Sequence, residues 1–106
     1  MKSQLLYLIQ VVIELLMDCG WEDNANWLSK YKNAIENTDQ NTERFYKLLD
    51  ELDDVLSGMG SLSDLPLRDK TGERSEQEIR SIQWDLIEQL GEAIETLRKA
   101  KHRTAS

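Results

Sequence analysis

The sequence predicts an all-α fold: a single-domain bundle of about four helices, with a long Gly/Ser-containing loop between the third and the fourth. Apolar residues recur at helical spacing in four blocks, and only one proline and five glycines occur among 106 residues. This length suits one domain with one hydrophobic core. The apolar fraction of 40% is concentrated in the four blocks, which argues against disorder. Within the single domain 1–106, the expected helices span approximately 3–18, 21–36, 40–56 and 75–101, and the loop spans 57–74.

The first expected helix, 3–18, is apolar around more than half of its circumference. Its polar positions share one narrow face with Tyr7; they are Ser3, Gln10, Glu14 and Asp18. A surface this apolar has to be covered from two sides, so the helix is predicted to contact at least two others. Gly20 follows it and supplies the left-handed backbone conformation in which many helices end.

The second expected helix, 21–36, is the aromatic one. Its apolar and aromatic side chains gather on one side; they are Trp21, Ala25, Trp27, Leu28, Tyr31, Ala34 and Ile35. A polar break over 37–41 separates this helix from the third. Thr38 or Asp39 is predicted to cap the third helix, because both side chains accept hydrogen bonds from free backbone N–H groups.

The third expected helix, 40–56, has the clearest helical spacing in the chain. Its apolar positions are Phe45, Leu48, Leu49, Leu52, Val55 and Leu56. Gly58 is predicted to end the helix, again through its conformational freedom.

The fourth expected helix, 75–101, begins with a capping box. In this motif the Ser75 hydroxyl and the Glu78 carboxylate each accept a bond from the other residue's backbone N–H. The core stripe of the helix consists of Ile79, Ile82, Leu86, Leu90, Ala93, Ile94 and Leu97. The opposite side carries Asp85, Glu88, Glu92 and Glu95. Four helices are therefore expected to share one core.

Trp84 departs from this pattern, because it lies off the core stripe of its helix. It falls on the same side as Gly91, almost two turns further along. An exposed indole is hydrophobically costly, so two expectations remain open. Either the loop 57–73 folds over Trp84, or a partner covers it.

The charge of the chain is acidic and unevenly distributed. The net charge is −7, yet Arg98, Lys99, Lys101 and Arg103 form a basic tail. Without these four cations, nine cations stand against twenty anions, so the body carries a charge of about −11. Cations at a helix C-terminus complement the helix dipole, which is the preferred explanation of the tail. Nucleic-acid binding by the tail is the minor alternative. The acidic body disfavours nucleic acid and anionic membranes as partners and favours basic ones.

Few groups are available for catalysis. His102 is the only histidine and Cys19 the only cysteine, so most nucleophile–base pairs and all His-containing zinc sites are excluded. The sequence therefore predicts no enzyme, no metal site and no cofactor.

Glu51-x-x-Asp54 and Glu92-x-x-Glu95 are similar to the acidic helical motifs of all-α nucleoside triphosphate pyrophosphatases, which bind magnesium. Asp54 and Glu92 point away from their own apolar stripes, so solvated faces explain these carboxylates better.

The single cysteine also bears on localisation. Cys19 is expected to be a buried thiol without an internal disulfide, which suits a reducing compartment. Gln10 and Glu14 interrupt the apolar run at the start of the chain, so neither a signal peptide nor a membrane span is expected. The predicted location is cytoplasmic.

The most distinctive segment lies in the loop, at Gly58-Met59-Gly60-Ser61-Leu62-Ser63-Asp64-Leu65-Pro66-Leu67. In the structural interpretation the glycines allow tight turns, the serines cap local N–H groups, and three leucines pin the loop to the bundle; these are Leu62, Leu65 and Leu67. In the functional interpretation the loop recognises a partner through Gly58, Met59, Gly60, Ser61 and Asp64. No lysine follows at the spacing of a phosphate-binding loop.

This segment resembles a family of short bacterial helical proteins that carry a Gly-Met-Gly-Ser-Leu-x-Asp-Leu block after an aromatic helix. Trp27-Leu28 is similar to that helix. In size, acidity and helical build, the chain also resembles immunity proteins that neutralise bacterial toxins, although it has no Asp-Tyr-Tyr signature of the nuclease-colicin immunity family.

These observations give three functional hypotheses. The first is a cytosolic immunity protein that binds a basic toxin domain through an acidic surface; its candidate contacts are Asp50, Glu51, Asp53, Asp54, Glu88, Glu92 and Glu95, with Trp84 as a candidate anchor. The second is a homo-oligomeric structural or adaptor module, a homodimer for example, in which Trp84 is buried between copies. The pyrophosphatase-like enzyme ranks third.

Overall fold

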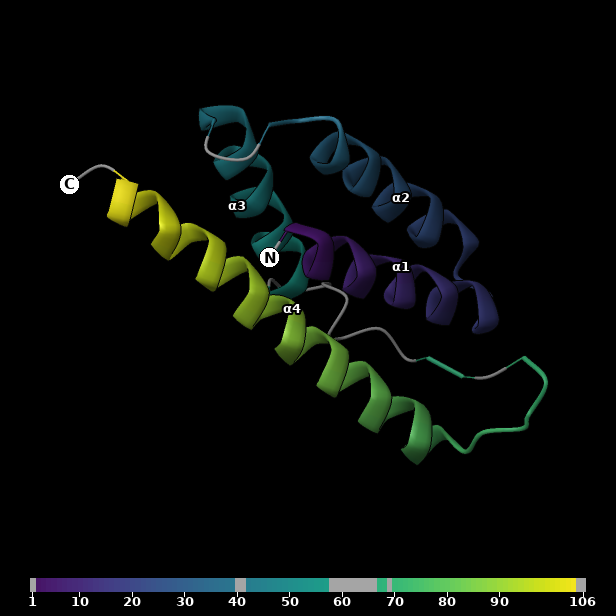
Figure 1. Cartoon of the computed structure of the whole chain (residues 1–106). Coiled ribbons are helices and arrows are strands. Elements are labelled where there is room, and N and C mark those ends of the chain that lie inside the picture. The colour runs from purple at the N-terminus through teal and green to yellow at the C-terminus, as the bar shows by residue number, and fades with distance from the viewer. Residues whose placement is uncertain (1, 40–41, 58–66, 69, 105–106) are drawn as a thin grey trace.

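Within the residues that it describes, the computed structural model contains four helices (Figure 1). They are α1 (Lys2–Asp18), α2 (Glu22–Glu36), α3 (Glu43–Ser57) and α4 (Glu76–Thr104). The structure describes the backbone of residues 2–39, 42–57, 67–68 and 70–104, and the side chains of these except 57 and 100–104. The prediction of an all-α fold with four helices and a long connection before the last helix is confirmed.

Each helix packs against two neighbours. α1 contacts α2 and α4, and α3 contacts the same two helices, so the four surround one core. Figure 1 shows α1 alongside α4, with α3 against the C-terminal part of α4. The molecule measures 50 × 24 × 21 Å. Its long dimension follows from α4, whose 29 residues span ~43 Å at ~1.5 Å per residue.

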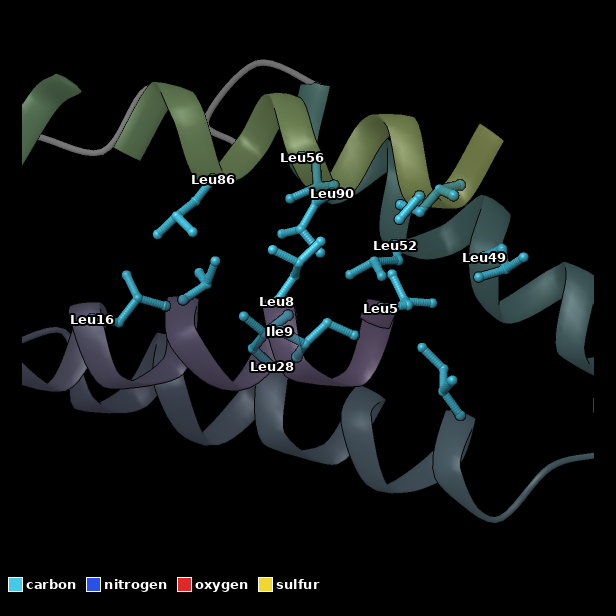
Figure 2. Packing of buried hydrophobic residues seen from close by; sticks show 14 of the residues in the cluster. Leu5, Leu8, Ile9, Leu16, Leu28, Leu49, Leu52, Leu56, Leu86 and Leu90 are labelled. Atoms are coloured by element: carbon cyan, nitrogen blue, oxygen red, sulfur yellow. The ribbon is translucent and has the colours of Figure 1, made fainter. Parts of the chain in front are cut away.

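The core is built from leucine and isoleucine side chains of all four helices. Figure 2 shows Leu8 and Leu16 of α1 pointing toward Leu86 and Leu90 of α4, with Leu52 of α3 beside them. The largest fully buried side chains are Phe45, Leu5, Ile9, Leu16, Leu28, Ile35, Leu49, Leu52, Ile79, Leu90, Ile94 and Leu97. Burial of one such side chain stabilises the fold by ~1.5–3 kcal/mol. The wide apolar surface of α1 is explained because α2 and α4 cover it from two sides.

Gly20 ends α1 as predicted. Its φ angle is +83°, in the left-handed region that side chains resist. The Trp21 N–H donates to the Leu16 carbonyl at 2.8 Å, and the Gly20 N–H donates to the Met17 carbonyl at 3.2 Å. This pair of bonds is the Schellman motif, which satisfies carbonyl groups at the helix end. Cys19 beside it is half-buried against the core rather than fully buried as expected.

The N-terminus of α3 differs from the prediction. Neither Thr38 nor Asp39 caps it; the Phe45 N–H donates to the Thr42 hydroxyl oxygen at 3.2 Å, and α3 begins at Glu43. The Thr38 hydroxyl instead donates to the Ala34 carbonyl at 2.6 Å, which ties it to the end of α2. A hydroxyl held at the end of one helix does not cap the next, so the helix starts about three residues later than expected.

The start of α4 agrees with the prediction. The Glu78 N–H donates to the Ser75 hydroxyl oxygen at 3.1 Å, which is the serine half of the expected capping box. The helix continues to Thr104, a little beyond the predicted end at 101.

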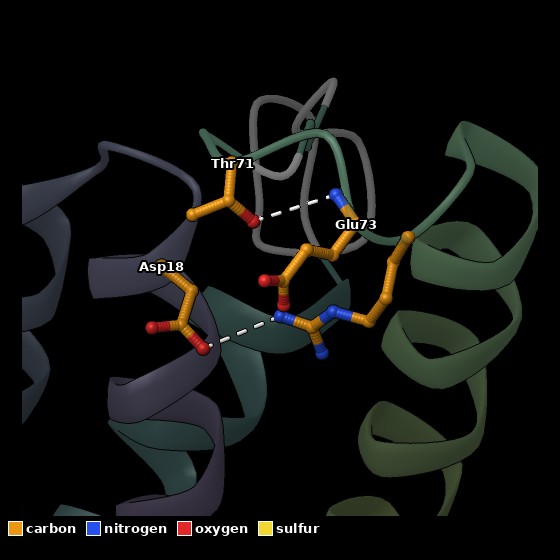
Figure 3. Close-up of polar contacts among 4 residues, drawn as sticks. Asp18, Thr71 and Glu73 are labelled. Carbon is orange, nitrogen blue, oxygen red and sulfur yellow. Dashed lines mark hydrogen bonds and ion pairs between the residues drawn. The ribbon is translucent and has the colours of Figure 1, made fainter.

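The C-terminal part of the connection between α3 and α4 is docked on the bundle. Leu67 is buried, as predicted, and lines a small apolar cavity with side chains of α1 and α4. The Lys70 N–H donates to the Asp18 carbonyl at 3.1 Å, and the Arg74 guanidinium contacts the Asp18 carboxylate at 3.3 Å (Figure 3). The Glu73 N–H in the same turn donates to the Thr71 hydroxyl oxygen at 3.4 Å. These contacts fix the chain where it enters α4.

Candidate partner-binding surface

The four predicted carboxylates of α3 point in different directions. Asp50 and Asp53 face α4, where the Arg98 guanidinium lies 3.0 Å from one and 3.3 Å from the other. The spacing of three residues puts both carboxylates on one side of α3, so a single planar guanidinium reaches both. All three side chains remain partly exposed to solvent, so these ion pairs stabilise the fold only modestly.

Glu51 lies on the opposite side of α3, toward α2. There it accepts a hydrogen bond from the Tyr31 hydroxyl. Burial raises the pKa of Tyr31, and the negative charge of Glu51 and this hydrogen bond raise it further. The Tyr31 ring in turn lies against Trp27, with ring centroids 4.7 Å apart. Glu51 is therefore part of the contact between α2 and α3.

The remaining predicted carboxylates are exposed. They are Asp54 on α3 and Glu88, Glu92 and Glu95 on α4. Among the residues that the structure describes, none of these four forms an ion pair. Asp54, Glu88, Glu92 and Glu95 are referred to below as the exposed carboxylates.

Trp84 is also exposed. It retains 58% of its accessible surface, and most of the loop 57–73 that was expected to cover it lies outside the residues that the structure describes. Tryptophan is enriched among the residues that carry most of the energy of protein interfaces, which makes Trp84 a candidate anchor.

Trp84 belongs to a narrow strip along the outside of α4. We define the α4 strip as Arg80, Trp84, Gly91 and Glu95. Spacings of four, seven and four residues put these positions within ~60° of the helix circumference, at ~100° per residue. Gly91 is half-buried and the other three are exposed.

A hollow of about 260 Å³ lies beside Gly91, between α3 and α4. It is lined by Asp53, Gly91, Ile94, Glu95, Arg98 and Lys99. A Cβ atom at Gly91 would have no neighbour within 4 Å, so packing within the chain does not require glycine at this position. Glycine inside a helix costs ~0.5–1 kcal/mol relative to alanine. Gly91 therefore leaves an open depression on the same side of α4 as Trp84, seven residues further along, at a cost to the helix.

The sequence alone missed two features of this surface. The ion pairs of Arg98 with Asp50 and Asp53 were missed for two reasons. Arg98 belongs to the basic tail of the sequence, and the two partners are 48 and 45 residues away. The hollow was missed because it depends on how α3 lies against α4. Gly91 inside a helical pattern was the one signal that pointed to it.

The loop motif, Gly58, Met59, Gly60, Ser61 and Asp64, lies outside the residues that the structure describes. In the described part of the chain, no group of three or more His, Cys, Asp or Glu side chains is placed to hold a metal ion.

Comparison of the chain with protein-family models, with curated protein sequences and with solved structures gave no significant match. Among the described helices, none is both long enough and apolar enough to cross a membrane.

Proposed function

We propose that this chain binds and neutralises a basic protein, in the way that immunity proteins neutralise bacterial toxins. The observation that carries the proposal is the group of exposed carboxylates on α3 and α4, which have no cation of their own among the described residues. The net charge of −7 adds a field that attracts basic partners from a distance. The resemblance to immunity proteins in size, acidity and helical build supports the same function.

The geometry suits charge-based inhibition. A toxin that cleaves nucleic acid has a basic cleft, because that cleft binds phosphates. Carboxylates held on rigid helices meet such a cleft without the entropic cost of ordering a loop. Complementary charge also accelerates association, which matters for a protein that has to block a toxin quickly.

The test compares two charge-reversed variants of equal net charge. Asp54→Lys/Glu92→Lys reverses two of the exposed carboxylates, whereas Glu14→Lys/Glu36→Lys reverses exposed carboxylates on α1 and α2. The immobilised wild-type chain is first used to isolate a basic protein from the source cell, and the dissociation constant of that purified protein is then measured for each variant.

We expect the first variant to weaken binding at least about tenfold more than the second, because contact charges act in addition to the long-range field. Binding of the wild type should also weaken as salt is raised. Equal weakening by the two variants would show that these carboxylates are not the contact surface. Affinity that does not change with salt or with either variant would overturn the proposal.

A second function, self-association as a structural or adaptor module, is favoured by a different observation: the exposed Trp84 and the depression at Gly91 lie on the same side of α4.

A further inference from the structure

We infer that the α4 strip is the contact surface between two copies of this chain, which pack with their α4 helices antiparallel across a two-fold axis. The inference rests on the second proposed function, self-association, and specifies its surface: Arg80, Trp84, Gly91, Glu95 and the hollow beside Gly91. Of these residues only Glu95 also belongs to the exposed carboxylates. The occupant of the hollow is Trp84 of the second copy.

The first argument is steric. Trp84 projects from α4 with 58% of its surface exposed, and Gly91 leaves room at its own position. The two are seven residues apart, or ~10.5 Å along the helix axis at ~1.5 Å per residue, and they lie on the same strip. If the two-fold axis passes between residues 87 and 88, Trp84 of each copy lies opposite Gly91 of the other. One surface thus carries both the projection and the depression that a two-fold contact requires.

The second argument is electrostatic. Arg80 and Glu95 each lie four residues further from the same axis, beyond Trp84 and Gly91 respectively. The antiparallel arrangement therefore places Arg80 of one copy opposite Glu95 of the other, twice. Among the described residues neither side chain has an ion pair within its own chain, so both are available. Two symmetric ion pairs would fix the register of the helices.

The hollow explains where the indole is buried. Ile94, which is itself almost completely buried, and Gly91 provide the apolar part of its lining. Glu95 lines the same hollow, next to the position that Arg80 of the second copy would reach. When the indole leaves water for such a site, it buries apolar area and makes close contacts, and both stabilise the dimer. A second copy is favoured over an unrelated protein because these features match each other at equal distances from one axis.

One residue opposes the contact. Glu88 lies at the edge of the strip and next to the proposed axis, so the two Glu88 carboxylates would lie near each other. Like charges across an interface cost free energy. The dimer should therefore tighten in Glu88→Gln, which removes this charge and leaves the size of the side chain unchanged.

The test is the oligomeric state of the purified full chain, measured by analytical ultracentrifugation over a wide concentration range. We expect a reversible dimer in the wild type. Arg80→Glu and Glu95→Arg should each raise the dimer dissociation constant about tenfold or more, which corresponds to ~1.4 kcal/mol. The double variant R80E/E95R should restore the wild-type value within about threefold, because it exchanges the two ends of each ion pair.

Two further variants test the steric argument. Gly91→Leu fills the depression and should give a folded monomer, since its own chain leaves open space at that position. Trp84→Ala should also give a monomer, whereas Trp27→Ala, which removes another exposed tryptophan from α2, should leave the dimer intact. Circular dichroism confirms that each variant is folded.

Three results would overturn the inference. The wild type could be monomeric at all concentrations, or the double variant could dimerise as weakly as the single variants. In the third, Trp27→Ala would raise the dimer dissociation constant as much as Trp84→Ala. The outcome is separable from the proposed function, because Asp54 and Glu92 lie outside the α4 strip. Loss of the dimer with intact binding of a basic partner, or the reverse, identifies which proposal fails.

Discussion

At the scale of single residues, the backbone conformation requires glycine at Gly20 but not at Gly91. Gly20 has a φ of +83°, whereas Gly91 lies in regular helix with open space around its missing Cβ. Gly20→Ala should lower the free energy of unfolding by ~1–2 kcal/mol, because an L-residue resists the left-handed conformation. A Cβ there would also lie 3.0 Å from Lys70 Cε, the end of a flexible side chain that can move away at little cost.

Gly91→Ala is the matched substitution, and it should raise the free energy of unfolding of the monomer by ~0.5–1 kcal/mol. Chemical denaturation at concentrations below the dimer dissociation constant measures both values. Destabilisation by both substitutions would show that Gly91 is needed for the fold of the chain itself. The interface explanation of this glycine would then lose its main support.

The sequence was sufficient for residues whose role depends on their neighbours in the chain. Gly20 and Ser75 were identified as helix boundaries from local chemistry alone, and both were confirmed. Trp84 was correctly placed off the core stripe, because helical periodicity fixes the direction of a side chain. Its exposure was not predictable, since that depends on whether another part of the chain covers it.

At the scale of the helices, the start of α3 gives a direct comparison of two threonines. Thr42 accepts a bond from the Phe45 N–H, whereas Thr38 donates to a carbonyl at the end of α2. Thr42→Ala should therefore cost ~1 kcal/mol of stability, as expected for loss of an N-cap. Thr38→Ala should cost less, because the carbonyl at a helix end can bond to water instead. Denaturant unfolding of the two variants checks the ranking, and the reverse order would place the cap at Thr38.

The helix boundaries also show where local prediction becomes ambiguous. Between α2 and α3 the chain offers five side chains able to cap a helix: Asn37, Thr38, Asp39, Asn41 and Thr42. Propensity alone does not choose among them. In the structure the side chains of Asn37 and Thr38 bond to carbonyl groups at the end of α2, and Thr42 caps α3.

At the scale of the whole molecule, the directions of the carboxylates on α3 depend on the order of the helices in space. The sequence predicted which residues of α3 face outward, but not which helix lies on either side. With α4 on one side and α2 on the other, Asp50 and Asp53 meet Arg98, and Glu51 meets Tyr31. Only Asp54 of the predicted group remains without such a contact among the described residues. The acidic surface is thus smaller than composition suggests.

The two proposed associations should respond to salt in opposite directions. Two copies of the chain each carry a net charge of −7, so they repel each other at long range, whereas a basic partner is attracted. Raising salt from ~0.01 M to ~0.15 M shortens the screening length from ~30 Å to ~8 Å. This change weakens the long-range forces much more than it weakens ion pairs in close contact, such as those proposed between Arg80 and Glu95.

We therefore expect the dimer to tighten and the complex with the basic partner to weaken over the same range of salt. Sedimentation of the purified chain gives the first dissociation constant, and titration with the isolated partner gives the second. Neutral sucrose at matched osmolality is the control for effects that do not depend on charge. A dimer that dissociates as salt rises would mean that the copies are held together mainly by ion pairs rather than by burial of Trp84. The steric part of the proposed interface would then be wrong.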